Sequence, residues 1–321
     1  MRSVTRRRVT RGLGGAVPLA LGLPGAGRAQ ERRKRVAFAN IDDASPFGAS
    51  VQRGLQAAAA QRAGIELTNF DNHSDAARAV ENARSVVAAR YDLFIQYNGQ
   101  AASNVPISRL MAGAGIKVLA IQVPVPGAPL FAVDNSASGA DSGRVLAEEG
   151  KRRWPDAVPV AVIIGLPEAG PMFRERGEAA KRAIAAVYPG VTFEEFSSKS
   201  DVGHVRQTTT DLLTRHPGRR MLIWAHVDEV ALAAVSAIRN TGRGGDAVVS
   251  TTGGSSAALA ELRRLGSPLL GTYSFFPELW GSDVFDLAER MLAGEAVPER
   301  SSPRQQMFVT AANVAQFETP R

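Results

Sequence analysis

The stretch DLLTRHPGRRMLIWAHVDEVALAAVSAIRNTG, residues 211–242, decides the fold class of this chain. Its His-Pro-Gly turn at 216–218 ends a helical segment, because proline cannot continue a helix and glycine tolerates the turn. The apolar run at 221–225 has the length of a buried strand. Asp228 follows at a position typical of a helix N-cap, and the helix that it opens ends at Gly242. This order predicts an open parallel sheet with ligands bound beyond the carboxyl ends of its strands, so residues 225–228 form a predicted ligand loop.

Strands and helices alternate along the chain after residue 35. The predicted strands are 36–41, 65–70, 93–97, 117–121, 159–164, 191–196, 221–225, 247–251 and 269–273. The predicted helices lie near 47–63, 74–90, 103–113, 136–152, 171–187, 203–215, 228–240, 255–265 and 278–293. This alternation favours parallel sheets flanked by helices, and a folded part of about 290 residues suits two lobes better than one core.

Residues 1–29 have the composition of an export signal. They contain six arginines, no acidic residue, an apolar run over 12–24, and small residues at 27–29 that permit cleavage. The run is too short and too rich in glycine to span a membrane. The sequence Thr-Arg-Arg-Arg-Val at 5–9 favours a twin-arginine signal, and an ordinary secretory leader is the alternative. Since the chain has no cysteine for a lipid anchor, we expect a soluble periplasmic protein after removal of the signal peptide.

The high positive charge of the chain comes mostly from this leader. Removing its six arginines from the 38 basic residues leaves 32 against 31 acidic residues, a net charge of +1. Residues 30–35 form a basic lead-in, which is typical of a solvated tail. Nucleic-acid binding is not expected, because it needs a basic patch on the folded surface. The first predicted strand starts at residue 36, which leaves no room for an N-terminal helix-turn-helix domain.

Several short motifs occur in the order found in one family. Besides 211–242, they are VAFAN with SPF at 36–40 and 45–47, VDN at 133–135, RERGE at 174–178, and VTAANV at 309–314. Together they resemble the sugar-binding family of periplasmic solute-binding proteins, the ribose-binding type. The resemblance implies an α/β fold of two Rossmann-like three-layer lobes with parallel sheets, joined by a three-segment hinge, the type I periplasmic binding protein fold. The motif at 309–314 corresponds to the final strand of that family.

The resemblance also implies how the chain is divided and what it does. The N-terminal lobe would comprise 36–134 plus 276–303, and the C-terminal lobe 135–275 plus 304–321. Such lobes close on a hinge around a small polar ligand, sugar-like or related, and deliver it to a membrane ABC permease. We expect a monomer that binds no cofactor and no nucleic acid. A periplasmic sensor for a chemoreceptor or sensor kinase, and an exported enzyme on the same scaffold, are the alternatives.

Most candidate ligand contacts lie near the predicted carboxyl ends of the strands. From the first lobe the candidates are Asn40, Asp42, Phe47, Asn98 and Gln122, and from the second Arg176, His226, Asp228, Thr252 and Phe275. Arg176 lies on the helix predicted near 171–187, where the resemblance implies that the second arginine of its motif donates to ligand oxygens. Short polar side chains beside aromatic rings suit a polar ligand with a C–H face, and a guanidinium offers a fixed fork of donors. Simpler structural roles stay open for four positions. They are a surface ion pair of Arg176 with Glu175 or Glu178, a helix cap at Ser45, a packed loop histidine at 226, and capping alone at Asp228.

The sequence departs from the ribose-type pattern at several of these positions. Those proteins have an Asp-Arg pair at Gln122-Val123, an Asn at Val227, an Asp at Thr252, and a polar amide near Phe275. A buried hydroxyl without its partner costs roughly 1–3 kcal/mol. We therefore expect a more apolar and aromatic pocket that does not bind a simple pentose tightly, and the identity of the ligand stays open.

The sequence contains no phosphate-binding loop, nucleophile elbow or HExxH motif, so no enzymatic activity is expected. The four histidines have no metal-ligand spacing, and no metal is expected. The run Gly-Gly-Ser-Ser at 253–256 precedes a predicted helix, and its backbone amides could bind an anion. A loop with a helix cap is the alternative for this run.

Overall fold

The structure is a computed structural model, and it describes residues 32–317 of the chain. The predicted signal peptide, residues 1–29, lies outside the described residues, as do the first two residues of the basic lead-in. The first strand already begins at Lys34. Arg35 packs its guanidinium over the ring of Tyr91, 4.4 Å from the centroid, and its backbone N–H donates to Asp92. The prediction of a solvated tail is therefore wrong where the lead-in enters the strand.

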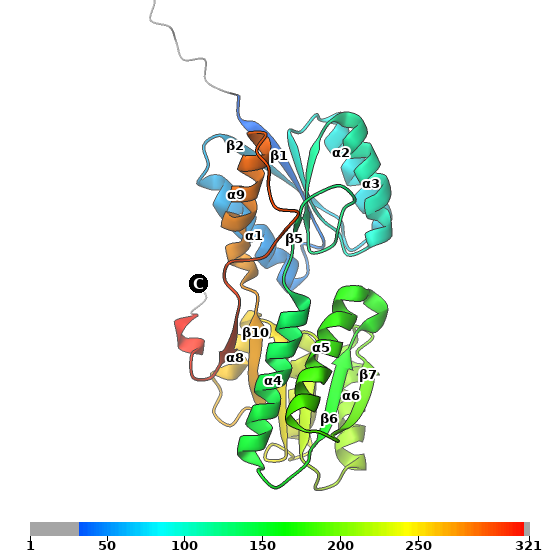
Figure 1. Ribbon diagram of the computed structural model, residues 1–321, viewed down its shortest axis with the longest axis vertical. Coiled ribbons are helices and arrows are strands. Elements are labelled where there is room, and N and C mark those ends of the chain that lie inside the picture. Colours follow the sequence, from blue (N-terminus) through cyan, green and yellow to red (C-terminus); the bar gives the residue numbers. More distant parts are fainter. Residues whose placement is uncertain (1–31, 318–321) are drawn as a thin grey trace, which may run out of the picture. The chain divides into compact units, whose positions relative to one another are not determined.

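In the described part of the chain, the first of two lobes is built on a six-stranded sheet in which every pair is parallel. In spatial order its strands are β11 (Arg300–Ser301), β5 (Leu130–Phe131), β4 (Lys117–Ile121), β3 (Leu93–Tyr97), β1 (Lys34–Asn40) and β2 (Ile65–Asp71). Helices α1 (Pro46–Ala60) and α9 (Trp280–Leu292) share one core cluster with these strands. Helices α2 (Ala76–Ala88) and α3 (Ala101–Ala114) share the other. Figure 1 shows α9 beside α1, although they come from opposite ends of the chain.

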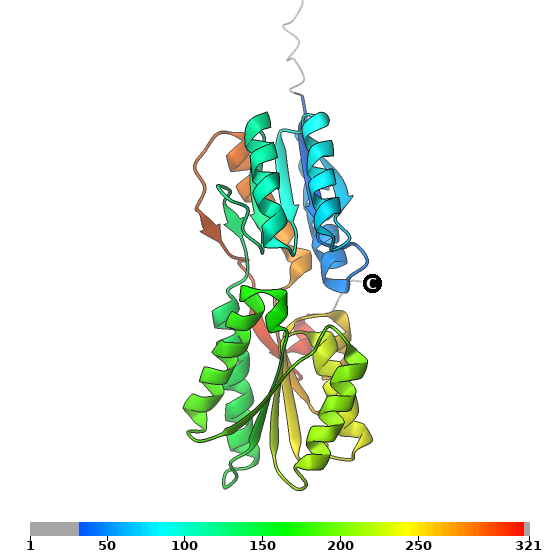
Figure 2. The same ribbon diagram turned by 90° about the vertical axis from the view of Figure 1, so that its right-hand side faces the viewer.

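The second lobe is also built on a six-stranded sheet, and all of its strands are parallel except the last one in the chain. In spatial order its strands are β12 (Met307–Thr310), β10 (Leu269–Ser274), β9 (Ala247–Gly253), β8 (Met221–Ala225), β6 (Val160–Gly165) and β7 (Thr192–Ser197). Strand β12 pairs antiparallel with β10. One core cluster is shared with α4 (Asn135–Arg153) and α5 (Pro171–Val187), and another with α6 (Val202–Arg215), α7 (Asp228–Asn240) and α8 (Ser256–Leu262). Figure 2 shows these helices on the two faces of the sheet.

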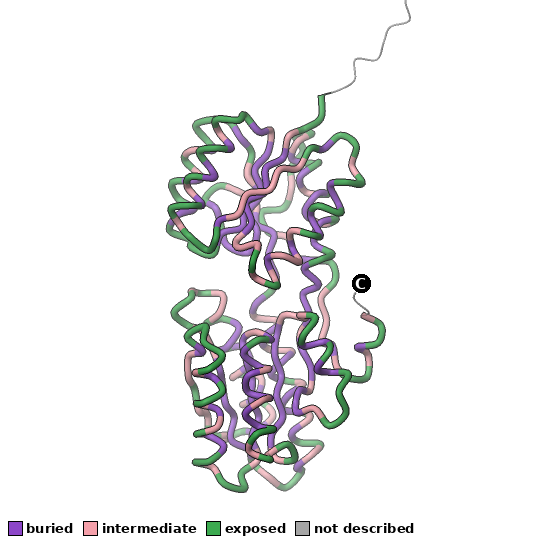
Figure 3. Tube along the Cα trace, turned by 180° about the vertical axis from the view of Figure 1, so that it is seen from behind, coloured by how far each residue is buried: buried purple, intermediate pink, exposed green. Residues whose placement is uncertain are grey.

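Strand β8 explains why the sequence around residue 221 is continuously apolar. Leu222 and Trp224 belong to the core under α4 and α5, whereas Ile223 belongs to the core under α6 and α7. A strand covered on both faces buries every side chain, so it shows no alternation with polar residues. Figure 3 shows the same distribution of burial along the backbone, with the central strands buried and the outer helix faces exposed.

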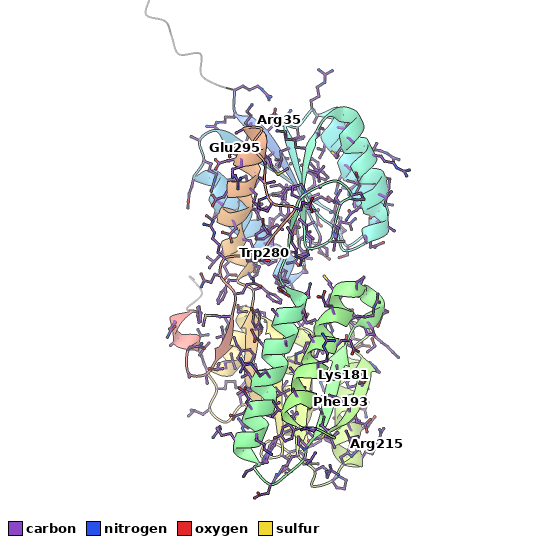
Figure 4. All side chains as sticks on the ribbon, in the orientation of Figure 1. Arg35, Lys181, Phe193, Arg215, Trp280 and Glu295 are labelled. Atoms are coloured by element: carbon purple, nitrogen blue, oxygen red, sulfur yellow. The ribbon has the colours of Figure 1, made fainter. Side chains whose placement is uncertain are left out.

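The chain changes sheets between β5 and α4, between β10 and α9, and between β11 and β12. A buried aromatic group lies at the second of these passages. The indole N–H of Trp280, at the start of α9 (Figure 4), donates to the Phe275 carbonyl at 2.8 Å. Its ring meets Phe47 and Phe131 edge-on, with centroids 5.4 and 5.6 Å away. These contacts anchor the segment between β10 and α9 to the core of the first lobe.

Helices α4 and α5 approach each other closely where α4 carries glycine. A Cβ atom on Gly139 would lie 2.1 Å from the carbonyl oxygen of Arg176, and one on Gly143 would lie 2.6 Å from that of Ala180. No side chain fits at these distances, so glycine is what permits the contact. This packing fixes the backbone that carries Arg176.

Of the helix N-caps predicted at Ser45 and Asp228, the structure confirms the first and contradicts the second. The Ser45 hydroxyl accepts from the Gly48 N–H at 3.1 Å and Pro46 opens α1, so the cap predicted there is confirmed. The N-cap of α7 is Val227, and Asp228 is the first helical residue. The prediction that Asp228 caps this helix is wrong, because its carboxylate is used in tertiary hydrogen bonds.

Two further differences concern short elements. The two-residue strands β5 and β11 were not predicted, nor were the 3-10 turns η1 (Pro167–Ala169) and η2 (Pro277–Leu279). The final strand, expected over 309–314, is β12, which ends at Thr310. The Thr310 N–H donates to the Asn313 side chain at 2.7 Å, and the 3-10 turn η3 (Val314–Gln316) follows. The local Asn313 hydrogen bond takes the place of further strand pairing.

Candidate functional site

Most of the candidate residues lie at the carboxyl ends of the strands, where the sequence predicts them. Asn40 ends β1, Asn98 follows β3, Gln122 follows β4, His226 follows β8, Thr252 lies near the end of β9, and Phe275 follows β10. The remaining four lie in the loop after β1 or on α1, α5 and α7. The structure thus brings candidates from each sheet to that sheet's carboxyl edge, and whether they contact a ligand stays a prediction.

Arg176 is the centre of the second lobe's group. It lies on α5, is 4% exposed, and reaches three other segments. Its Nε and Nη2 donate to Asn135 Oδ1, at 3.2 and 2.6 Å. Its Nη1 donates to Thr252 Oγ1 and to the His226 carbonyl, both at 3.0 Å. Arg176 therefore ties the start of α4 to the ends of β8 and β9, and the alternative of a surface ion pair is wrong.

The guanidinium also contacts aromatic rings. Its central carbon lies 5.0 Å from the centroid of Phe275 and 5.7 Å from that of Phe173. Burial lowers the pKa of Arg176 to about 10, so the group stays positively charged at neutral pH. A guanidinium has five N–H donors, and the hydrogen bonds described above use four. One N–H on Nη2 has no assigned acceptor among residues 32–317.

His226 is a buried, neutral imidazole. It is 3% exposed, and its ring meets Phe173 edge-on with centroids 5.4 Å apart. Burial and then the charge of Arg176 lower the pKa of His226 to about 3. Its Nε2 lies 2.9 Å from the Ser198 hydroxyl oxygen. Its Nδ1 is buried and has no hydrogen-bond partner within the part of the chain that the structure describes.

Asp228 is buried and internally bonded. Its oxygens accept from the Ser255 backbone N–H at 2.5 Å and the Thr272 hydroxyl at 2.7 Å. Burial raises the pKa of Asp228 to about 6. The Gly254 N–H donates to Thr272 Oγ1 at 3.1 Å, and the Ser255 hydroxyl caps α8. With two of its amides taken up internally, the Gly-Gly-Ser-Ser run is a loop with a cap, and the hypothesis of an anion site there is wrong.

In the first lobe, Asn40 shapes the loop after β1. Its Nδ2 donates to Asp43 Oδ1 at 2.6 Å and to the Gly48 carbonyl at 3.0 Å, and its Oδ1 accepts from the Ile41 N–H. Asp42 is half-buried, and its Oδ1 accepts from the Ala44 N–H at 2.8 Å. The amide of Asn40 is thus fully used within the loop, whereas Asp42 remains partly accessible.

The side-chain amide of Asn98 is used internally, whereas that of Gln122 is not. Asn98 is 1% exposed, and its Nδ2 donates to Ser103 Oγ at 2.5 Å. Its Oδ1 accepts from the Gln100 N–H at 3.1 Å. Gln122 has φ +62°, a left-handed conformation that is uncommon for residues other than glycine. Its N–H donates to the Phe131 carbonyl, while its side-chain amide makes no hydrogen bond within residues 32–317. A strained backbone with an unused amide is typical of a functional position.

Phe47 and Phe275 belong to the aromatic group around Trp280. Their centroids are 6.3 Å apart, edge to face, and Phe47 is half-buried. Tyr273 lies 5.9 Å from Phe275. Phe275 therefore contacts both the Phe47 ring of the first lobe and the guanidinium of Arg176.

Several residues of this site were missed by sequence reasoning. They are Asn135, Phe173, Ser198 and Thr272, which bind or pack against Arg176, His226 and Asp228. Asn135 was visible as part of the Val-Asp-Asn motif but was not assigned a role. Asp134, its neighbour, caps α4 through the Ala137 N–H, which leaves the Asn135 side chain free to face Arg176.

Two cavities in the described part of the chain lie away from the candidate residues. A cavity of about 480 Å³ is lined by the ends of α2 and α3, and one of about 190 Å³ by α9 and β11; neither is lined by a candidate residue. Among residues 32–317, no group of three or more His, Cys, Asp or Glu side chains is arranged to hold a metal ion. Within the same range, no helix is both long and apolar enough to cross a membrane.

Comparison with known families identifies the chain's relatives. The model of the periplasmic binding protein domain family matches residues 36–296. The chain belongs to this family. It is a family of binding proteins, which agrees with the expectation drawn from the sequence. The ribose import binding protein of Bacillus subtilis (strain 168) is 26% identical over 265 residues, which cover 80% of this chain and 81% of that protein.

Solved structures show the same fold at low sequence identity. A periplasmic solute-binding protein from Actinobacillus succinogenes 130z, described with bound D-allose, superposes with a TM-score of 0.78 at 20% identity. The match covers 89% of this periplasmic binding protein and 100% of that chain. A solute-binding protein from Bacillus halodurans C-125, described with bound myo-inositol, has a TM-score of 0.74 at 20% identity, with 90% and 98% covered. The predicted type I fold of two α/β lobes is therefore confirmed.

Proposed function

We propose that the chain is the periplasmic substrate-binding component of a sugar-type ABC importer, which captures a small polar ligand between two lobes by hinge closure. The observation that carries this proposal is the family match over residues 36–296. The relatives support it, because solved proteins of this fold are described as ABC transporter components with D-allose, glycerol or myo-inositol bound. These descriptions favour an import component over a sensor or an enzyme.

The lobes in this proposal are 36–134 with 276–303, and 135–275 with 304–321. The three passages of the chain between the sheets would form the hinge, and the Trp280 group would hold one of them. The protein would act as a monomer, exported by the signal at 1–29 and recognised by a membrane permease when closed.

The proposed ligand site consists of all ten candidate residues in two roles. Gln122, Arg176 and His226 have unused hydrogen-bonding groups and would contact the ligand directly. Asp42 would add a polar contact, with Phe47 and Phe275 as the apolar walls. The other four, Asn40, Asn98, Asp228 and Thr252, are already hydrogen-bonded internally, so they would hold the loops in place.

A ligand screen tests the function. Purified mature protein is heated with aldoses, alditols, inositols and sugar acids, and a ligand that binds only the native state raises the melting temperature. At a concentration of about 100 times Kd the gain is about 2.7 kcal/mol. X-ray scattering with the best ligand is expected to show a more compact particle. A panel without any thermal shift, or a shift without any change in scattering, contradicts capture by hinge closure.

Two arginine variants make this screen specific. Arg176→Met is expected to abolish the thermal shift, since it removes the donors at the centre of the second lobe's group. Arg174→Met is the matched control, because Arg174 is exposed and its side chain donates only to the Pro167 carbonyl. Equal shifts in both variants would remove Arg176 from the site.

A further inference from the structure

The positive charge of Arg176 is buried without a carboxylate partner. Among residues 32–317 it forms no ion pair, and its four hydrogen bonds go to an amide, a hydroxyl and a backbone carbonyl. Asp228 acts on it only through its charge, because both Asp228 oxygens accept from Ser255 and Thr272. A buried charge costs several kcal/mol unless it is paired. The site therefore favours a negative group that comes from outside the protein.

His226 supplies a second donor beside this charge. The Ser198 hydroxyl oxygen accepts from the Ser200 N–H at 3.3 Å and lies 2.9 Å from His226 Nε2. If Nε2 carried the ring proton, both the Ser198 hydroxyl hydrogen and the Nδ1 lone pair would lack partners. If Nδ1 carries it, Ser198 donates to Nε2 and only the Nδ1–H is unsatisfied. The second arrangement leaves fewer buried polar groups unpaired, so Nδ1 is assigned as a donor.

The two unused donors belong to neighbouring side chains. Arg176 donates to the backbone carbonyl of His226, and both side chains contact the ring of Phe173. The charge of Arg176 also acts directly on the His226 ring. Neither a guanidinium nor an Nδ1–H can accept a hydrogen bond. A sugar hydroxyl oxygen could accept from these donors, but it adds an O–H donor of its own and leaves the charge of Arg176 unpaired, whereas a carboxylate only accepts and neutralises the charge.

We propose that the ligand is a polyhydroxylated carboxylic acid, a sugar acid, whose carboxylate binds the spare N–H of Arg176 and the Nδ1–H of His226. This inference rests on the proposed binding function. The hydroxyl groups of the sugar acid would meet the first lobe's loops, where the half-buried Asp42 carboxylate and the unused Gln122 amide oxygen offer acceptors. The acid group distinguishes this ligand from the neutral compounds named for the relatives.

The test compares acids with their uncharged counterparts. Calorimetric titration of the mature protein uses aldonates of increasing chain length, D-gluconate among them, each paired with the alditol of the same configuration. The best aldonate is expected to bind at least about tenfold more tightly than its alditol, as a charge-assisted hydrogen bond does over a neutral one. Its affinity is also expected to fall as NaCl is raised, while that of a neutral ligand does not.

A variant pair separates ligand recognition from folding. His226→Phe keeps an aromatic ring against Phe173 but removes the donor, and it is expected to weaken aldonate binding about tenfold. His204→Phe is the matched control, since His204 also meets a phenylalanine edge-on, at 6.1 Å from Phe196, and lies outside the site. It is expected to bind like the wild type.

The outcomes distinguish this inference from the function on which it rests. Alditols that bind as tightly as the acids, or a His226→Phe protein that binds the aldonate normally, overturn the sugar-acid assignment and leave the binding function intact. Binding of neither class overturns the sugar-acid assignment, and the absence of binding to the aldoses and inositols of the wider panel as well overturns the binding function. Should His226→Phe fail to fold, the acid–alditol comparison and its salt dependence in the wild type still decide the question.

Discussion

Substitution of Gly139 by alanine tests whether α4 and α5 are packed as tightly as the structure shows. The added methyl carbon would lie 2.1 Å from the Arg176 carbonyl oxygen and 2.9 Å from its carbonyl carbon. These are backbone atoms of a neighbouring helix, so they cannot swing aside as the end of a long side chain can. Helix α5 has to shift, and Arg176 shifts with it.

The expected change in the free energy of unfolding is the balance of opposing contributions. Alanine is favoured over glycine in a helix interior by about 1 kcal/mol. Overpacking a buried contact costs about 1–3 kcal/mol, and the displaced Arg176 hydrogen bonds add about 1 kcal/mol each. The net loss of stability is expected to be about 2–4 kcal/mol, which in a protein of this size lowers the melting temperature by about 5–10 °C.

Thermal and urea unfolding, followed by circular dichroism on the ligand-free protein, measure this loss. Gly113→Ala is the matched control, because Gly113 also lies in a helix, α3, but a Cβ there has no neighbour within 4 Å. It is expected to leave stability unchanged or raise it by up to about 0.5 kcal/mol. A Gly139→Ala protein that melts at or above the wild-type temperature refutes the proposed contact.

Three further predictions concern single side chains. The raised pKa of Asp228 means that the unfolded chain loses this proton first, so its contribution to stability falls between about pH 4 and about pH 6. Urea unfolding at a series of pH values should therefore show Asp228→Asn gaining up to about 3 kcal/mol relative to the wild type over that range, and a parallel pH dependence of the two proteins would disprove this. The lowered pKa of His226 predicts ring NMR signals of the Nδ1–H tautomer that do not titrate between about pH 8 and about pH 5, whereas a midpoint near 6.5 would show an accessible imidazole. Ser45→Ala should cost about 1 kcal/mol in urea unfolding through loss of the α1 cap, and Ser50→Ala, at an exposed hydroxyl that bonds its own helix, should cost less.

The regular elements were predictable because each follows from a local pattern. Helices α5 and α7 have the predicted bounds, 171–187 and 228–240, since proline or a polar loop opens them and their apolar faces are continuous. The strands that helices cover on both faces were also predictable, because each is a continuous apolar run. Strands β5 and β11 were not, because a two-residue strand has no period and exists only through its neighbours.

The site was predictable in position but not in its internal bonding. The carboxyl-edge rule placed His226 in a loop beyond its strand, because it depends only on strand order. Arg176 was assigned from its helix and its motif, and the structure brings the two residues together. Neither argument revealed that Asn135 takes two of the Arg176 hydrogen bonds, or that Asp228 serves Ser255 and not its own helix. Such choices depend on which segments meet in space, and neither spacing nor residue type in a single sequence specifies them.

The interleaved course of the chain has a consequence for how it is made. The first lobe is completed by α9 and β11 and the second by β12, so both wait for segments near the C-terminus. A ribosome releases the other strands earlier, and until residue 310 emerges the backbone of β10 offers an unpaired edge to other chains. Neither sheet is therefore complete until the C-terminal segments have been made. A prematurely terminated product lacking β12 keeps the β10 edge open, and an open edge of this kind favours aggregation.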